Sequence, residues 1–228
     1  MSITVGNKTV VNPTPGGNTT TISNHTQNSG SDRLMVVLIG QNNGQNVNSV
    51  TWDGVAMTQI HTRNFTAIST RYTAYYLLNP TDGGTPNVVV NYSAAVWNPV
   101  VICVQSFTGA SGIGNEGTNG LANSVHTQSL TISAGSVIMG AGISSYTISG
   151  ITIDGTLTQS PNFDFDGSVN GKRFTGEFSA PISTAGSKNI SIDTGASSFT
   201  VGNLRFEVQE AGGTPPTTQN SNFLTFFH

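Results

Sequence analysis

The sequence predicts an all-β protein, a single antiparallel β-sandwich of jelly-roll type with an extended C-terminal tail. Short runs of strand length recur along the 228 residues, turn dipeptides separate them, and no segment has both the apolar stripe and the caps of a helix. Only 8% of the residues are charged and 36% are hydrophobic. This composition suits strands whose solvent-facing sides carry Thr and Ser.

The expected strands are apolar or rich in Tyr and Thr, and they lie at residues 34–39, 70–78, 87–92, 100–107, 136–139, 188–192 and 204–208. The turns between them contain dipeptides that readily adopt positive φ: Gly83-Gly84, Asp154-Gly155, Asp166-Gly167 and Asn170-Gly171. Alternation of such runs and turns indicates a sheet protein throughout.

The two halves of the chain resemble each other at a spacing near a hundred residues. Residues 50–59 match 151–159 as a strand, an Asp-Gly turn and an apolar-Thr-Gln segment. The further matches are 71–76 with 173–178, 87–91 with 189–193, and 104–105 with 208–209. We expect repeat halves at about 19–110 and 126–212.

A repeat of this length fits either two small sandwiches or two interlocked halves of one. The stretch between the halves, residues 109–123, is short, rich in Gly and free of Pro. We therefore expect one sandwich over residues 1–212.

Composition also argues against several functions. The net charge of −3 comes without a basic cluster, so we expect no nucleic-acid partner. No apolar stretch approaches the length of a membrane span, so we expect no membrane partner. Cys103 is the only cysteine and lies in an apolar run, which indicates a core residue and excludes a disulfide within the chain.

No motif supports catalysis, a cofactor or a metal. Residues 112–117 match G-x-G-x-x-G, but no helical pattern follows to bind a pyrophosphate. The acidic loop at 164–170 lacks the ligands of a calcium site, and the four histidines form no zinc pattern. We expect a protein that is not an enzyme.

Aromatic residues leave a role in sugar binding open. Flat rings stack on sugars when exposed, although in strands they more often belong to the core. The candidates are Trp52, Trp97, Tyr72, Tyr75, Tyr76 and Tyr92. A surface glycan therefore remains an alternative partner.

The character of the chain changes at its C-terminal end. Residues 213–219 resemble an extended linker, since Pro215-Pro216 favours polyproline II. The last eight residues contain four large apolar side chains: Phe223, Leu224, Phe226 and Phe227. These four form either a last strand of the same sandwich or an assembly interface held by a neighbouring subunit.

Several stretches together resemble a known family. The segments are 32–37 (DRLMVV), 50–58 (VTWDGVAMT), 76–80 (YLLNP), 88–90 (VVV), 106–109 (SFTG) and, in the second half, 134–139 (AGSVIM). This pattern is similar to a β-sandwich domain found in bacterial surface proteins and phage structural proteins, and the resemblance covers about residues 19–212. It implies a jelly-roll or concanavalin-like sandwich and brings no catalytic residues.

The expected function is therefore structural. We expect a bacteriophage virion protein, either a capsid decoration (cement) protein or a fibre-like subunit, which binds its own copies as a homo-oligomer such as a trimer and also a capsid or other particle protein. The N-terminal residues 1–6 lack the regions of a signal peptide, which fits release within a particle. The alternatives are a secreted cell-surface filament subunit that uses strand exchange and a carbohydrate-binding or receptor-binding adhesin.

Overall fold

The computed structural model describes residues 2–13, 16–42, 44–65, 69–82, 86–96, 100–121, 125–144, 150–157, 165–169, 172–193 and 201–212. Within these ranges the chain forms strands β1 to β18. The described residues include no helix that could cross a membrane. The predicted all-β sandwich class is confirmed.

The described residues of the first half form β1 (Thr4–Val11), β2 (Thr19–Ile22), β3 (Leu34–Asn42), β4 (Val47–Trp52), β5 (Val55–Ala56), β6 (Thr58–Phe65), β7 (Thr70–Leu78), β8 (Val88–Tyr92) and β9 (Val100–Thr108). Those of the second half form β10 (Ala110–Leu121), β11 (Val125–Ile132), β12 (Val137–Ser144), β13 (Gly150–Ile153), β14 (Thr156–Leu157), β15 (Phe165–Val169), β16 (Lys172–Phe178), β17 (Gly186–Asp193) and β18 (Val201–Glu210).

The two halves have the same strand order. The first half forms a five-stranded sheet, β1-β9-β3-β7-β6, and a four-stranded sheet, β2-β8-β4-β5. The second half forms β10-β18-β12-β16-β15 and β11-β17-β13-β14, which is the same order with every strand number raised by nine. Among the described residues, every strand pairing joins strands of the same half and is antiparallel. The sequence repeat is therefore a repeat of topology.

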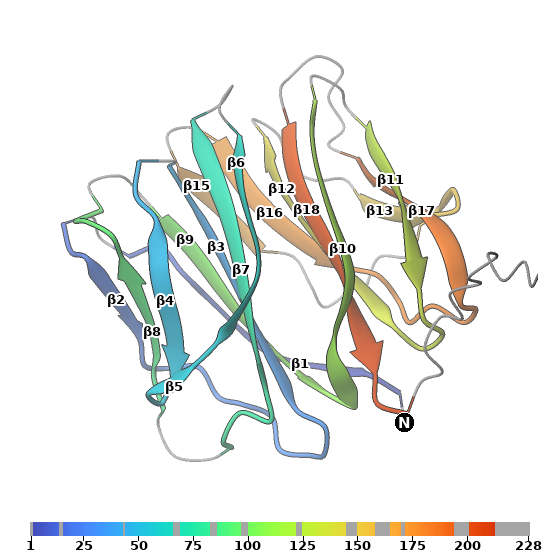
Figure 1. Ribbon diagram of the computed structural model, residues 1–228, viewed down its shortest axis with the longest axis horizontal. Helices are drawn as coiled ribbons and strands as arrows, with labels where there is room; N and C mark the ends of the chain where they lie inside the picture. Colours follow the sequence, from blue (N-terminus) through green and yellow to red (C-terminus); the bar gives the residue numbers. More distant parts are fainter. Residues whose placement is uncertain are drawn as a thin grey trace, which may run out of the picture.

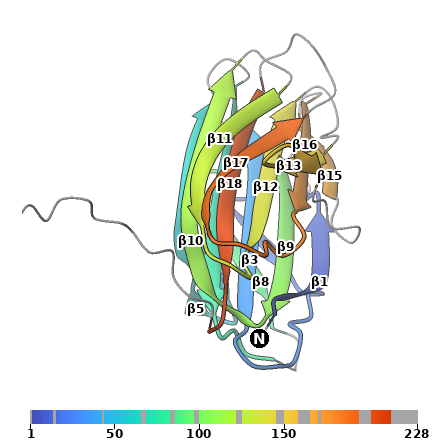
Figure 2. The same cartoon turned by 90° about the vertical axis from the view of Figure 1, so that its right-hand side faces the viewer.

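The four sheets stack as four layers, with the two five-stranded sheets in the middle (Figures 1 and 2). One core lies between the sheets of the first half and another between those of the second half. A third, central core joins the halves. Its members from the two halves include Leu34, Val36, Leu38, Tyr72 and Phe107 with Val137, Met139, Leu204, Phe206 and Val208.

Burial on both faces explains why the apolar runs of the inner strands do not alternate with polar residues. Along β3, Leu34 and Val36 face the central core, whereas Met35 and Val37 face the core of the first half. A sheet that is covered on both sides requires apolar side chains at successive positions.

Asp-Gly turns connect equivalent hairpins in the two halves. Asp53 and Gly54 join β4 to β5 with φ of 49° and 79°, and Asp154 and Gly155 join β13 to β14 with φ of 51° and 80°. Two positive φ values are the signature of the tight hairpin turn that Asp-Gly favours. The equivalent backbone bonds, Asp53 N–H to the Asn87 carbonyl and Asp154 N–H to the Asn189 carbonyl, both measure 2.9 Å.

The structure differs from the expectation in three details. The sandwich has four sheets, because each half completes its own pair. The stretch 109–123 is no spacer, since most of it forms β10, the first strand of the second half. The sequence match of 104–105 with 208–209 does not agree with the strand pairing. Phe107 pairs with Leu34 at the start of β3, and Val208 pairs with Val137 at the start of β12, so Phe107 and Val208 are the equivalent residues.

Candidate functional site

Two of the regions singled out in the sequence fall outside what the structure describes. The tail residues Phe223, Leu224, Phe226 and Phe227 lie beyond the last described residue, so the assembly interface stays a hypothesis. In the acidic loop only residues 165–169 are described, and they form β15, while Asp164 and Asn170 lie outside.

The glycine motif at 112–117 lies within strand β10, and the chain continues as strand rather than helix. This geometry offers no helix N-terminus for a dinucleotide. Among the described residues, no three His, Cys, Asp or Glu side chains gather as they would around a metal ion.

Cys103 and most of the candidate aromatic rings belong to the cores. Cys103 is buried, and desolvation raises the pKa of its thiol to about 12. Among the aromatic candidates, Trp52, Tyr72, Tyr75 and Tyr92 are buried, Tyr76 packs partly buried on the central core, and Trp97 lies outside the described ranges. The buried rings cannot stack on a sugar in solution.

A buried hydrogen-bonded chain connects the loop after β2 to β9 in the first half. His25 Nδ1 lies 3.0 Å from Thr9 Oγ1, and His25 Nε2 lies 2.7 Å from Ser106 Oγ. Ser106 in turn donates to Gln27 Oε1 at 2.9 Å. The imidazole also meets the Trp52 ring edge to face, with ring centroids 6.0 Å apart.

The direction of these hydrogen bonds does not suit a serine nucleophile. Since the Ser106 hydroxyl donates to Gln27, its oxygen accepts the proton of His25 Nε2. His25 Nδ1 is then the acceptor for Thr9. A base that activates a serine must instead accept the serine proton. His25 and Ser106, at 3% and 0% exposure, are a structural pair.

We expect His25 to make the fold sensitive to acid. Desolvation lowers its pKa from 6.5 to about 4, so between these values the unfolded chain binds a proton that the folded chain does not. The free energy of unfolding should fall as pH drops from 6.5 to 4, by up to about 1.4 kcal/mol per pH unit and on the order of 3 kcal/mol in all.

Urea unfolding of the wild type and of His25→Asn at pH 7, 6, 5 and 4.5 measures this effect. The variant lacks the titrating ring, so its stability should decline less steeply over this range. Equal slopes for the two proteins would show that other groups account for the acid sensitivity.

The equivalent position of the second half also holds a buried polar group. Glu207 on β18 holds the position that Ser106 holds on β9, because Glu207 pairs with Ile138 of β12 as Ser106 pairs with Met35 of β3. Its side chain is fully buried. Its Oε1 accepts the Ser133 backbone N–H at 2.6 Å and the Ser136 hydroxyl at 2.7 Å, and its Oε2 accepts the Asn115 N–H at 3.3 Å. The carboxylate thus ties β10 and the β11–β12 turn to β18.

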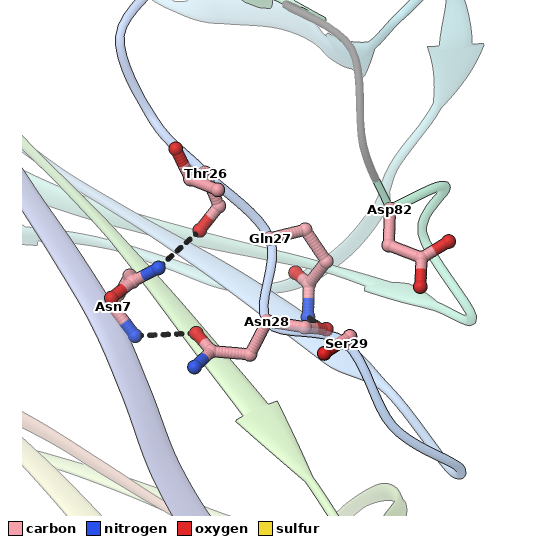
Figure 3. A pocket seen from close by; sticks show the side chains of 6 residues that line it. All are labelled: Asn7, Thr26, Gln27, Asn28, Ser29 and Asp82. Atoms are coloured by element: carbon pink, nitrogen blue, oxygen red, sulfur yellow. Dashed lines mark hydrogen bonds between the residues drawn. The ribbon is translucent and has the colours of Figure 1, made fainter.

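Beside the first network the surface forms an open hollow of about 580 Å³ (Figure 3). It is lined by Asn7, Thr26, Gln27, Asn28, Ser29 and Asp82. Asn7 fixes the loop because its Nδ2 donates to the Thr26 carbonyl at 3.0 Å and its backbone N–H donates to Asn28 Oδ1 at 2.6 Å. Arg33 Nη1 forms an ion pair with Asp82 Oδ2 at 3.0 Å. The hollow offers amide, hydroxyl and carboxylate groups and no aromatic ring.

Sequence reasoning did not find these polar networks. A weak signal was present, because Gln105 and Ser106 interrupt the apolar run of β9 and Glu207 interrupts that of β18. The partners His25 and Gln27 come from a loop without any pattern, so only the fold brings them to Ser106.

Comparison of the chain with protein-family models, with curated proteins and with solved structures finds no match. The resemblance to phage and bacterial surface domains thus has support at the level of the all-β sandwich alone.

Proposed function

We propose that this protein is a structural subunit of a bacteriophage particle, a capsid decoration protein or a fibre-like subunit, which acts by burying surface against its own copies and a shell protein. The observation that carries the proposal is the duplicated strand order, with two pairs of sheets joined through one central core.

The strand order adds support. In each half the first strand pairs with the last and the second with the eighth, so that β1-β9-β3-β7 faces β2-β8-β4-β5. This order supports a jelly roll, an architecture used by viral capsid proteins and also by lectins. Because fold alone does not determine function, the choice between these uses must come from an interaction.

In this proposal the tail residues Phe223, Leu224, Phe226 and Phe227 are the contact between copies. Their apolar surface of roughly 500 Å² is worth on the order of 10 kcal/mol when buried. Ordering eight residues costs a similar amount. The tail therefore requires a preformed acceptor.

Deletion of residues 213–228 is expected to leave the sandwich folded and to abolish oligomerisation or attachment to the particle. Light scattering and the melting temperature of the truncated chain, measured beside the full chain, test this. A truncated chain that unfolds, together with a monomeric full-length protein, would show that the tail is the last strand of its own sandwich.

The alternatives are a cell-surface filament subunit and a sugar-binding adhesin. The polar hollow around Asn28 favours the adhesin as second candidate, because amide and carboxylate groups suit sugar hydroxyls. Retention on immobilised glycans that is lost in Asn28→Ala would support it. Capsid or tail genes next to the coding gene would support the virion.

A further inference from the structure

The second half carries a smaller hollow of about 260 Å³ beside the Asp154 turn. Its apolar floor includes Ile153 and Ile182, which are 7% and 8% exposed. On its rim, Lys188 Nζ lies 3.3 Å from Asp154 Oδ2 and 3.2 Å from Thr184 Oγ1. The walls are therefore held in place without a ligand.

In the first half an indole ring stands at the chain position that corresponds to Ile153. Trp52 precedes the Asp-Gly turn of its half as Ile153 precedes the turn of the second half. Trp52 is fully buried, and its Nε1 lies 3.1 Å from Thr81 Oγ1.

Thr81, the residue that binds this indole, also has a counterpart in the second half. In the first half the Asn79 N–H donates to the Arg33 carbonyl at 2.8 Å, and Thr81 lies two residues after Asn79. In the second half the Ile182 N–H makes the equivalent bond to the Ser136 carbonyl, also at 2.8 Å, and Thr184 lies two residues after Ile182. Ile153 and Thr184, which line the hollow, are thus the counterparts of Trp52 and its partner Thr81, and the second half has an isoleucine where the first half has an indole.

The chain leaves the described structure beside this hollow. The Glu210 side chain lies over Gly135, and the Gly135 N–H donates to the Ile182 carbonyl at 2.7 Å. The described part ends at Gly212, and the segment beyond it contains Phe223, Phe226 and Phe227.

We propose that the hollow between Ile153 and Ile182 is the acceptor for a phenylalanine ring from the C-terminal segment of a neighbouring copy. This inference rests on the proposed function, in which the tail joins copies. The phenylalanine ring of the neighbouring copy then packs beside Ile153, at the position that the buried Trp52 indole holds in the first half. Because the exit of the chain and the hollow are neighbours, two copies that meet there can exchange tails reciprocally.

The length of the linker allows the tail of one copy to reach the hollow of a facing copy. The ten residues from 213 to 222 contain Pro215-Pro216 and can span roughly 30 Å when extended. The hollow of the same chain lies next to the exit, and binding within a chain is strongest when the linker matches the distance to be spanned.

Ile153→Trp in the full-length chain tests the proposal by filling the hollow from within. We expect it to keep the wild-type melting temperature within a few degrees and to weaken self-association at least tenfold in light scattering. The matched control is Val55→Trp, which adds the same ring to the equivalent hairpin of the first half, where Val55 is 52% exposed. The control should associate as the wild type does.

Disulfide trapping gives an independent measurement that does not depend on how Ile153→Trp folds. A Ser183→Cys chain, mixed with a Phe226→Cys chain, should form a mixed disulfide dimer under mild oxidation. Ser29→Cys, at the other hollow, should form none with the same Phe226→Cys chain. The native Cys103 does not compete, because it is buried and its pKa is raised to about 12.

The outcomes separate this inference from the proposed function. If deletion of the tail abolishes assembly but Ile153→Trp assembles normally and no mixed disulfide forms, the acceptor lies elsewhere and the assembly role stands. If the Ser183→Cys/Phe226→Cys double variant closes a disulfide within a monomer, the tail binds its own chain and the inference is wrong. A monomeric wild type would contradict both.

Discussion

Separate production of residues 1–109 and 110–212 is expected to yield no soluble, cooperatively folded monomer from either half. The chain passes between the halves at Gly109, where φ is 70° and no strand pairing is cut. Each fragment would keep its own two sheets but would expose its side of the central core, including Phe107 in one fragment and Phe206 in the other. An apolar face of this extent leads to aggregation or to association with a second copy.

Co-expression of the two fragments is the control, because it restores the central core without the peptide link and should recover a soluble complex. Circular dichroism and thermal melts of the separate and combined fragments decide the matter. Two fragments that each melt cooperatively as monomers would show that the halves are independent domains and that the central core contributes little.

The fold class was predictable because the apolar runs and the Asp-Gly turns are local signals. All seven expected strands lie within or overlap strands of the structure, and the expected segment 70–78 coincides with β7. The equivalence of Trp52-Asp53-Gly54 and Ile153-Asp154-Gly155 was visible as well, since a positive-φ turn requires particular residues.

The stacking of four layers was not predictable in the same way. An apolar run such as 34–39 indicates burial on both faces but does not say what covers each face. Strand β10 was missed because its glycines and polar residues lack strand propensity, and its pairing with β18 is tertiary. Polar sites depend on contacts between distant segments, such as His25 with Ser106, which are 81 positions apart.

Replacement of Glu207 by Ala is expected to destabilise the protein by about 3–5 kcal/mol. Three buried or half-buried donors, the N–H groups of Asn115 and Ser133 and the Ser136 hydroxyl, would lose their acceptor. Arg205, two positions away on the same face of β18, is buried as well. Burial leaves little water to replace these interactions, which makes the loss larger than that of a surface group.

Denaturant unfolding of Glu207→Ala beside Glu116→Ala measures this difference. Glu116 is the matched control, because its side chain is 36% exposed and it binds His61 at 3.1 Å across the two halves. An exposed pair of this kind contributes about 0–1 kcal/mol. Glu207→Gln should fall between the two, since its amide oxygen can still accept from Ser133 and Ser136 whereas its nitrogen meets the Asn115 N–H as a second donor. Equal stability of all three variants would mean that the network around β18 is not what fixes β10 and the β11–β12 turn in place.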